Sequence, residues 1–131
     1  PEALRACGQS RPKVGHLVSI AEAVVAGTLS LPRVCDAPLD DARKELVSVQ
    51  GLDTWTAELL LLYSIGAMDA FPVGAVGLME AHKRLSGHET RMDIKGFAAH
   101  AGRWRPHRGV AAHLLWAWRH LDRGDASPSP S

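Results

Sequence analysis

Apolar residues recur every three or four positions along most of this chain, which is the spacing of amphipathic helices. Strict apolar–polar alternation, which would indicate strands, is sustained nowhere. The pattern therefore predicts an all-α domain of about six helices. They are expected at residues 12–25, 39–49, 54–62, 74–85, 94–101 and 106–121, after a last helical turn at 2–5.

Helix ends are predicted from capping chemistry. Ser10 is expected to cap the first full helix, with Pro12 in its first turn and Gly27 at its end. The segment between that helix and the next, 29–37, is interpreted as a loop because prolines lie near its ends. Asp40 and Asp41 are expected to cap the helix at 39–49, and Asp93 the helix at 94–101, which Gly102 is expected to end. Gly87 is expected at the start of the loop after the helix at 74–85, and Pro106 in the first turn of the last helix.

Apolar stripes predict which face of each helix is buried. In the second half of the chain the residues expected to face inward are Val76, Met79, Leu85 and Leu78, then Ile94, Phe97 and Ala101, then Val110, Leu114, Ala117, Trp118 and Leu121. In the first half the stripes are Leu17, Ile20, Val24 and Val25, then Leu39, Ala42, Leu46 and Val49.

Length and composition narrow the class of protein. The chain has 131 residues, of which 46% are hydrophobic, as expected for one small globular domain at 1–124 with a disordered tail at 125–131. No apolar run approaches the roughly 20 residues of a membrane span. Cys7 and Cys35 fit no metal-ligand spacing; they are interpreted as two free buried thiols, with a disulfide between them as the alternative. We therefore expect a cytoplasmic protein, associated with the nucleoid if it is bacterial.

Charge is concentrated near the end of the chain. Between Arg103 and Arg123 lie five arginines and three histidines against the single acidic residue Asp122. This segment is basic enough to contact nucleic-acid phosphates, although a solvated helix face explains it equally well. The histidines form no metal-ligand trio, so they are interpreted as ordinary surface or core residues.

One stretch, residues 46–78, carries the candidate site. Gly51 marks a tight turn between two helices, and Phe71 and Pro72 interrupt the chain before another helix starts near Ala75. The backbone N–H groups at such a turn, with the hydroxyl of Thr54 or Thr56, suit a phosphate. The two short linkers predict that the turn and Ala75 lie near one another. The alternative is a plain αα-hairpin, which commonly contains glycine.

Three ordered motifs resemble the helix-hairpin-helix DNA glycosylases, and most of all their 3-methyladenine DNA glycosylase II branch. The motifs are LVSVQGLDTWTAELLLL at 46–62, GAMDAFPVGAVGL at 66–78 and RWRPHRGVAAHLLW at 103–116. The family patterns are L-P-G-I-G-x-W-T-A, D-x-F-P-x-x-D and R-W-x-P-x-R followed by a Trp. The resemblance runs from Leu4 to about Leu121.

The resemblance implies a duplex-DNA site at the turn. Backbone carbonyls of Val47, Val49 and Leu52 would hold a monovalent cation beside the phosphate, and no other cofactor is expected. Trp55 and Trp116 would line the pocket for a flipped cationic purine, or they are ordinary core residues. A Lys at the Trp55 position would be needed for lyase chemistry, and the four cluster-binding cysteines of another branch are missing. The implied DNA-binding residues are Gln50, Gly51, Leu52, Asp53, Thr54, Thr56 and Arg105.

Two residues depart from the family pattern. Ala75 stands where the family has its catalytic Asp, which stabilises the cationic sugar, so we expect glycosylase activity to be weak or lost. Asp53 replaces the second glycine of the turn and brings a carboxylate to the place of the phosphate. A helical backbone or a left-handed turn would tolerate Asp there. Asp69 matches a separate family Asp, interpreted as a cap or turn residue.

The chain also lacks counterparts of the family's early helices, so we expect exposed apolar surface and a partner chain that covers it. The resulting hypothesis is a DNA-glycosylase-like protein of base excision repair that is impaired by Ala75. The alternatives are a catalytically inactive module that binds DNA or a protein on the same scaffold, and a structural remnant that associates with another chain.

Overall fold

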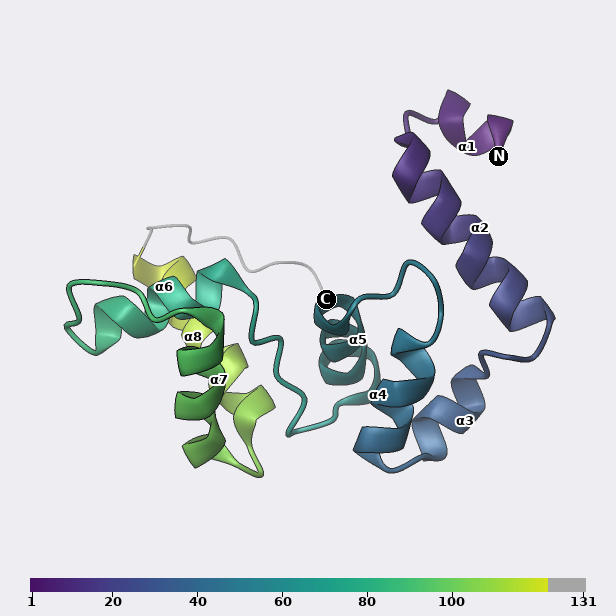
Figure 1. Cartoon of the computed structure of the whole chain (residues 1–131). Helices are drawn as coiled ribbons and strands as arrows, with labels where there is room; N and C mark the ends of the chain where they lie inside the picture. Colours follow the sequence, from purple (N-terminus) through teal and green to yellow (C-terminus); the bar gives the residue numbers. More distant parts are fainter. Residues whose placement is uncertain (123–131) are drawn as a thin grey trace. The chain divides into compact units, whose positions relative to one another are not determined.

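The computed structural model describes residues 1–122, and the described part is helical, with no strand. This confirms the predicted all-α class (Figure 1). Backbone contacts divide the chain into two compact units, Pro1–Ile65 and Gly66–Ser131, and each is described by itself. The predicted tail, 125–131, lies outside the described residues. The α-helices are α1 Glu2–Ala6, α2 Arg11–Val25, α3 Leu31–Asp36, α4 Leu39–Val47, α5 Thr54–Leu60, α6 Val76–Leu85, α7 Ile94–Ala101 and α8 Arg108–Asp122.

Two further helical segments lengthen these elements. A π-helical turn, Leu61–Ile65, continues α5, and a 3-10 turn, Gly102–Trp104, follows α7. Gly102 therefore ends the α-helix, but the chain continues as a 3-10 helix, because the φ of Gly102, −54°, is an ordinary right-handed value. Among the described residues, no helix is long and apolar enough to cross a membrane.

Helix α3 overturns one prediction, because residues 29–37 were expected to form a loop. The Ser30 side chain accepts a hydrogen bond from the backbone N–H of Arg33, and Pro32 lies in the first turn, where its missing N–H costs nothing. The side chain of Glu45 in α4 then holds this turn, accepting from the Ser30 amide at 2.9 Å and from the Arg33 guanidinium at 2.7 Å. Proline in this segment starts a helix and does not break one.

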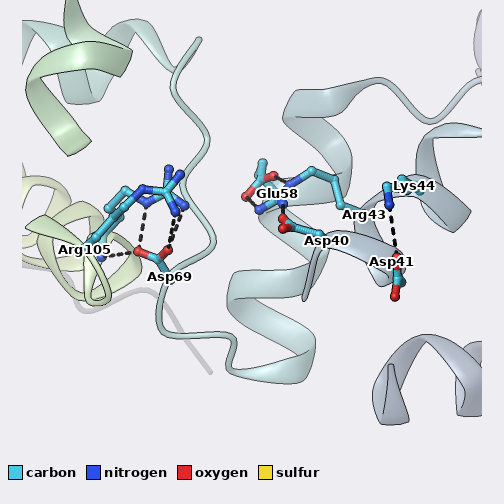
Figure 2. Close-up of polar contacts among 8 residues, drawn as sticks. Asp40, Asp41, Arg43, Lys44, Glu58, Asp69 and Arg105 are labelled. Carbon is cyan, nitrogen blue, oxygen red and sulfur yellow. Dashed lines mark hydrogen bonds and ion pairs between the residues drawn. The ribbon is translucent and has the colours of Figure 1, made fainter. Parts of the chain in front are cut away.

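The other capping predictions are confirmed with two exceptions. Ser10 and Asp93 cap α2 and α7 through the amides of Lys13 and Gly96, and Gly27 follows α2 with a φ of +73°. Asp40 and Asp41 do not cap α4, which begins after Pro38; they lie in its first turn and pair with Arg43 and Lys44 (Figure 2). Pro106 precedes α8 and is not part of it, after a cis bond from Arg105.

The first unit has a core around α4 and α5. Ala42, Leu46 and Val49 are buried, as predicted, and so are Ala57 and Leu61, and α4 packs against α5. The Glu58 side chain enters this core with 5% of its surface exposed and pairs with Arg43, which also reaches Asp40 (Figure 2). In α2, by contrast, the apolar residues Leu17, Val24 and Val25 are exposed, and the buried residue is Val14.

The stripe predictions for the second unit are confirmed for Leu78, Met79, Phe97 and Ala101 and wrong for most of the others. In α6 the buried residues are Leu78, Met79, Ala81 and His82, and in α7 they are Phe97 and Ala101, whereas Val76, Leu85 and Ile94 are more than half exposed. In α8 the buried residues are Gly109, Ala112 and Leu115, while Leu114 and Leu121 are 65% and 78% exposed. The stripe prediction for α8 is therefore wrong. Small residues carry little hydrophobic signal, yet Gly109 and Ala112 let α8 pack closely, and α6 packs against it.

Two histidines take part in the second core. His82 in α6 is 6% exposed, and its Nε2 lies 2.9 Å from Nε2 of His100 in α7 and 3.2 Å from Oγ of Ser86. One imidazole must donate and the other accept in such a pair. Burial, followed by the charges of His100, His88 and Arg103, lowers the pKa of His82. Burial, followed by Arg103 and His88, lowers the pKa of His100.

Acidification should therefore destabilise the protein. The unfolded chain takes up protons on both imidazoles near pH 6.5, whereas the folded protein resists them. The contribution of these two neutral imidazoles to the free energy of unfolding is therefore complete above about pH 6.5. Below that pH it falls by at most about 1.4 kcal/mol per pH unit for each imidazole. Urea unfolding between pH 5 and pH 8 measures this slope. His82→Gln should reduce the slope of the free energy of unfolding against pH, while His120→Gln, on an exposed part of α8, should leave that slope unchanged. Equal slopes in the unaltered protein and both variants would contradict the role of His82.

Candidate nucleic-acid interface

The turn between α4 and α5, residues 47–56, is called the hairpin below. Helix α4 ends at Val47, the Leu52 amide donates to the Val49 carbonyl at 3.1 Å, and α5 begins at Thr54. Gly51 has a φ of +97°, a left-handed value that a side chain strains. The predicted glycine turn is therefore confirmed in its backbone geometry.

A residue that the sequence reasoning did not single out also forms part of this site. A Cβ built on Gly51 would lie 2.7 Å from Cβ and 2.8 Å from Cγ of His16, so no other residue fits between the turn and α2. His16 lies 35 positions before Gly51, and no local spacing links the two, so only the fold brings them together.

A cavity of about 510 Å³ opens at the hairpin. Among the described residues, the amides of Gln50, Gly51 and Thr54 have no backbone or side-chain acceptor. Unpaired amides at a polar cavity offer donors to an anion. The lining residues are His16, Val47, Ser48, Val49, Gln50, Gly51, Leu52, Asp53 and Thr56, which include most of the predicted hairpin residues.

Asp53 caps helix α5. Its Oδ1 accepts from the Thr56 amide at 2.8 Å, and its backbone is extended, with a φ of −78° and a ψ of 169°. Neither the helical nor the left-handed backbone expected for an Asp at this position is present. Hydrogen bonds from the Thr56 side chain and amide hold the pKa of Asp53 below its usual value, and the His16 charge adds to this effect. The ionised Asp53 carboxylate therefore accepts the hydrogen bond of the Thr56 amide, which a bound phosphate would otherwise accept.

In the second unit, Asp69 ties the linker before α6 to the start of α8. Its carboxylate accepts from the Arg108 amide at 3.2 Å and from the Arg108 guanidinium at 2.8 Å, and Arg105 lies 3.7 Å away (Figure 2). The Met68 carbonyl accepts from the Gly109 amide at 2.7 Å. These contacts, with the Arg108 guanidinium first, lower the pKa of Asp69. The prediction that Asp69 is a cap or turn residue is thus confirmed, since its carboxylate caps the first turn of α8.

Ala75 is buried at the start of α6. It is the N-cap residue, and no side chain there accepts a hydrogen bond from the first turn. Trp116 and Arg119 of α8 lie over this turn: a Cβ on Gly77 would be 3.3 Å from Nη1 of Arg119 and 3.5 Å from Nε1 of Trp116. The sequence placed Trp116 and Ala75 in one site, and the second unit brings them to the same turn.

The remaining predicted residues are divided between the two units. Trp55, on α5, is 45% exposed, and Thr54 beside it is also exposed. Arg105 is exposed and paired with Asp69. The expected proximity of Gly51 to Ala75 stays a prediction, because the two residues belong to different units.

No protein-family model matches the sequence. Known proteins match it clearly. The chain is 36% identical over 96 residues to the Mycobacterium tuberculosis protein named "Probable bifunctional transcriptional activator/DNA repair enzyme AlkA", a match to 72% of this chain and 19% of that protein. It is 30% identical over 119 residues to DNA-3-methyladenine glycosylase 1 of Schizosaccharomyces pombe, covering 88% of this chain and 51% of that one.

A solved structure gives the same result. The S. pombe 3-methyladenine DNA glycosylase Mag1 in complex with abasic DNA superposes with a TM-score of 0.81 at 28% identity, over 88% of this chain and 56% of that chain. The chain belongs to the helix-hairpin-helix DNA glycosylase superfamily. The S. pombe relative is named a DNA-3-methyladenine glycosylase and the mycobacterial one a DNA repair enzyme. The chain spans about half the length of the first and a fifth of the second.

Proposed function

We propose that this chain is a DNA-glycosylase-like protein of alkylation repair that binds duplex DNA at the hairpin and hydrolyses the N-glycosidic bond of alkylated purines weakly, because Ala75 lacks a carboxylate. The observation that carries DNA binding is the hairpin cavity, which is lined by His16 and by Gln50 and Gly51, whose amides have no acceptor among the described residues. A relative of the same fold is described in complex with abasic DNA.

The hairpin amides would bind a backbone phosphate, which positions the protein without reading sequence. The Thr56 hydroxyl is engaged by Asp53 and is not available to the phosphate, whereas the exposed guanidinium of Arg105 can bind a phosphate of its own. Asp53 weakens this site, since its carboxylate occupies the Thr56 amide and repels phosphate.

A monovalent cation fits the same cavity. Val47, Val49 and Leu52 all line it, and carbonyl oxygens are donors that suit a hard cation. The Val49 carbonyl already accepts from the Leu52 amide but has a second lone pair. The cation would supply positive charge beside the phosphate and so offset part of the Asp53 charge.

Trp55 is proposed to stack on the extruded base, and Trp116 keeps the base-pocket role that the family resemblance implies. An indole stacks on a cationic purine and attracts it through its negative face. The exposure of Trp55 supports this role, since an ordinary core Trp would be covered. Without a Lys at position 55, hydrolysis is not accompanied by strand cleavage through a Schiff base.

Asp53→Gly tests the hairpin as the DNA site. Removing the carboxylate frees the Thr56 amide and one repulsive charge, so duplex affinity at low salt should rise about tenfold. Fluorescence anisotropy with a labelled duplex measures it. Asp93→Gly is the matched control, because Asp93 caps α7 in the same geometry, and it should leave DNA affinity unchanged. Unchanged affinity in Asp53→Gly would reject the hairpin site.

An inactive binding module is the second candidate, and one observation favours it. Val110, Leu114 and Leu121 form an exposed apolar stripe along α8, which a monomeric protein seldom presents to water. We propose that a partner chain covers this stripe. Sedimentation of the protein alone and with candidate partners tests the proposal, and Leu114→Glu should abolish the association.

A further inference from the structure

The second unit contains a cavity at the starts of α6 and α7, called the α6–α7 cavity below. Its volume is about 510 Å³, which falls within the usual range of cavities that hold a ligand or a large side chain. One part of the lining comes from the first residues of α6 and the turn before it, and the other from the residues around the start of α7. The lining residues are Gly74, Val76, Met79, Arg91, Met92, Asp93, Ile94 and Lys95.

Most of this lining is apolar, and part of it is exposed. Val76 and Ile94 are 58% and 55% exposed, although both were expected to face inward. Met79 is buried and Met92 is half-buried, and their flexible thioether chains adapt to the shape of the group that packs on them. Large apolar side chains that line a cavity and face water indicate a binding surface.

Positive charge flanks the apolar lining. Arg91 and Lys95 are exposed, and neither takes part in an ion pair among the described residues. The acidic residue of the lining, Asp93, is engaged elsewhere, because its Oδ1 accepts from the Gly96 amide at 2.7 Å and caps α7. The α6–α7 cavity therefore offers an apolar interior and two cations that lack a carboxylate partner in the described part of the chain.

We propose that the α6–α7 cavity is a docking site for an acidic segment of a partner protein. A large apolar side chain of that segment enters the cavity, and acidic residues on either side of it pair with Arg91 and Lys95. An apolar anchor in a pocket, ringed by contacts that exclude water, is the arrangement that dominates affinity in protein interfaces. Opposite charges at the rim add specificity and a faster association.

Charge and shape together favour a protein over DNA at this cavity. Phosphates would pair with Arg91 and Lys95 but would leave the apolar lining exposed, whereas an acidic segment with an apolar side chain satisfies both. The lining includes no residue of the hairpin and none of the exposed stripe of α8. The proposal therefore does not rest on the proposed function.

A fluorescein-labelled peptide with one phenylalanine between two pairs of glutamates, in a Gly-Ser frame, is the probe. Anisotropy at low salt should give a dissociation constant below about 1 mM. Replacing the phenylalanine with alanine, or the glutamates with glutamine, should each weaken binding about tenfold. Absence of binding up to about 1 mM, or equal binding of the alanine peptide, would overturn the proposal.

Gly74→Phe blocks the cavity without straining the backbone. A Cβ on Gly74 would meet nothing within 4 Å, and the φ of Gly74 lies outside the left-handed range. This variant should bind the peptide about tenfold more weakly. Gly102→Phe is the matched control, because a Cβ on Gly102 also meets nothing within 4 Å and Gly102 does not line the cavity. Equal affinities in the two variants would overturn the proposal.

Arg91→Glu provides a test that does not depend on the folding of Gly74→Phe, since exposed side chains contribute little to stability. It should weaken peptide binding about tenfold and reduce the dependence on salt. Arg103→Glu, which changes an exposed arginine of the same unit outside the lining, should weaken binding at most about twofold. Similar losses in both variants would reduce the effect to net charge and overturn the proposal.

Two other occupants are distinguished with the same variants. If Gly74→Phe weakens binding of a labelled duplex and the peptide does not compete with that duplex, DNA occupies the cavity and the proposal is overturned. If sedimentation shows self-association that Gly74→Phe abolishes, the occupant is a second copy of this chain, which also overturns it. Peptide binding without duplex binding would defeat the proposed function and support the docking site.

Discussion

Replacing Ala75 with Asp should raise the release of 3-methyladenine from alkylated duplex DNA about a thousandfold. Cleavage of the glycosidic bond leaves positive charge on the sugar, and a carboxylate in a site shielded from water stabilises that charge by several kcal/mol. The methyl group of Ala75 contributes nothing of this kind. Single-turnover release of radiolabelled base from alkylated DNA, measured for both proteins, gives the ratio directly.

Ala75→Asn is the matched control. Ala75 is the N-cap of α6 and has no capping side chain, so Asp and Asn should each add about 1 kcal/mol of stability through the same hydrogen bond. Only Asp supplies a negative charge, and only Asp should restore activity. Equal activity in the two variants would refute the electrostatic role. If Ala75→Asp gains stability but no glycosylase activity, the loss of activity has another cause, and Asp53 at the hairpin is the first candidate.

Arg43→Ala should destabilise the first unit by about 3 kcal/mol. Glu58 is 5% exposed and pairs with Arg43 in the core beside α4 and α5 (Figure 2). Removing Arg43 leaves this carboxylate in a poorly solvated place without its cation, which costs more than the pair contributes. The free energy of unfolding in urea, followed by circular dichroism, measures the loss.

A neighbouring ion pair supplies the control. Lys44 pairs with Asp41 at 3.1 Å, and both side chains are more than half exposed, so Lys44→Ala should cost less than about 1 kcal/mol. Adding Glu58→Gln to Arg43→Ala should restore part of the stability by removing the uncompensated charge. Similar losses in the two alanine variants would show that Glu58 is not held by Arg43.

These predictions differ in how much of their basis was visible in the sequence. The two departures from the family pattern, Ala75 and Asp53, could be read from aligned motifs alone. The Arg43–Glu58 pair, His16 at the hairpin and Arg119 over α6 could not, because each joins residues that no local spacing relates. His82 and His100 were interpreted as ordinary residues, and their shared hydrogen bond emerged only when α6 and α7 packed together.

The sequence by itself determined the helical class, the caps at Ser10 and Asp93, and the glycine turn at Gly51, because these depend on backbone preferences of residues a few positions apart. The loop expected around Pro32 failed because proline at a helix start and proline in a loop look alike without the Glu45 contact that holds α3.

For α2 and α8, only the tertiary structure decided which face is buried. Helix α8 carries two faces that could pack, and the more hydrophobic one, with Val110, Leu114 and Leu121, is exposed, whereas Gly109 and Ala112 are buried. Close approach of backbones favours small residues at a helix contact, and hydrophobic periodicity does not record that geometry. The same packing brings Arg119 and Trp116 to the turn after Ala75, a juxtaposition that the order of residues along the chain does not contain.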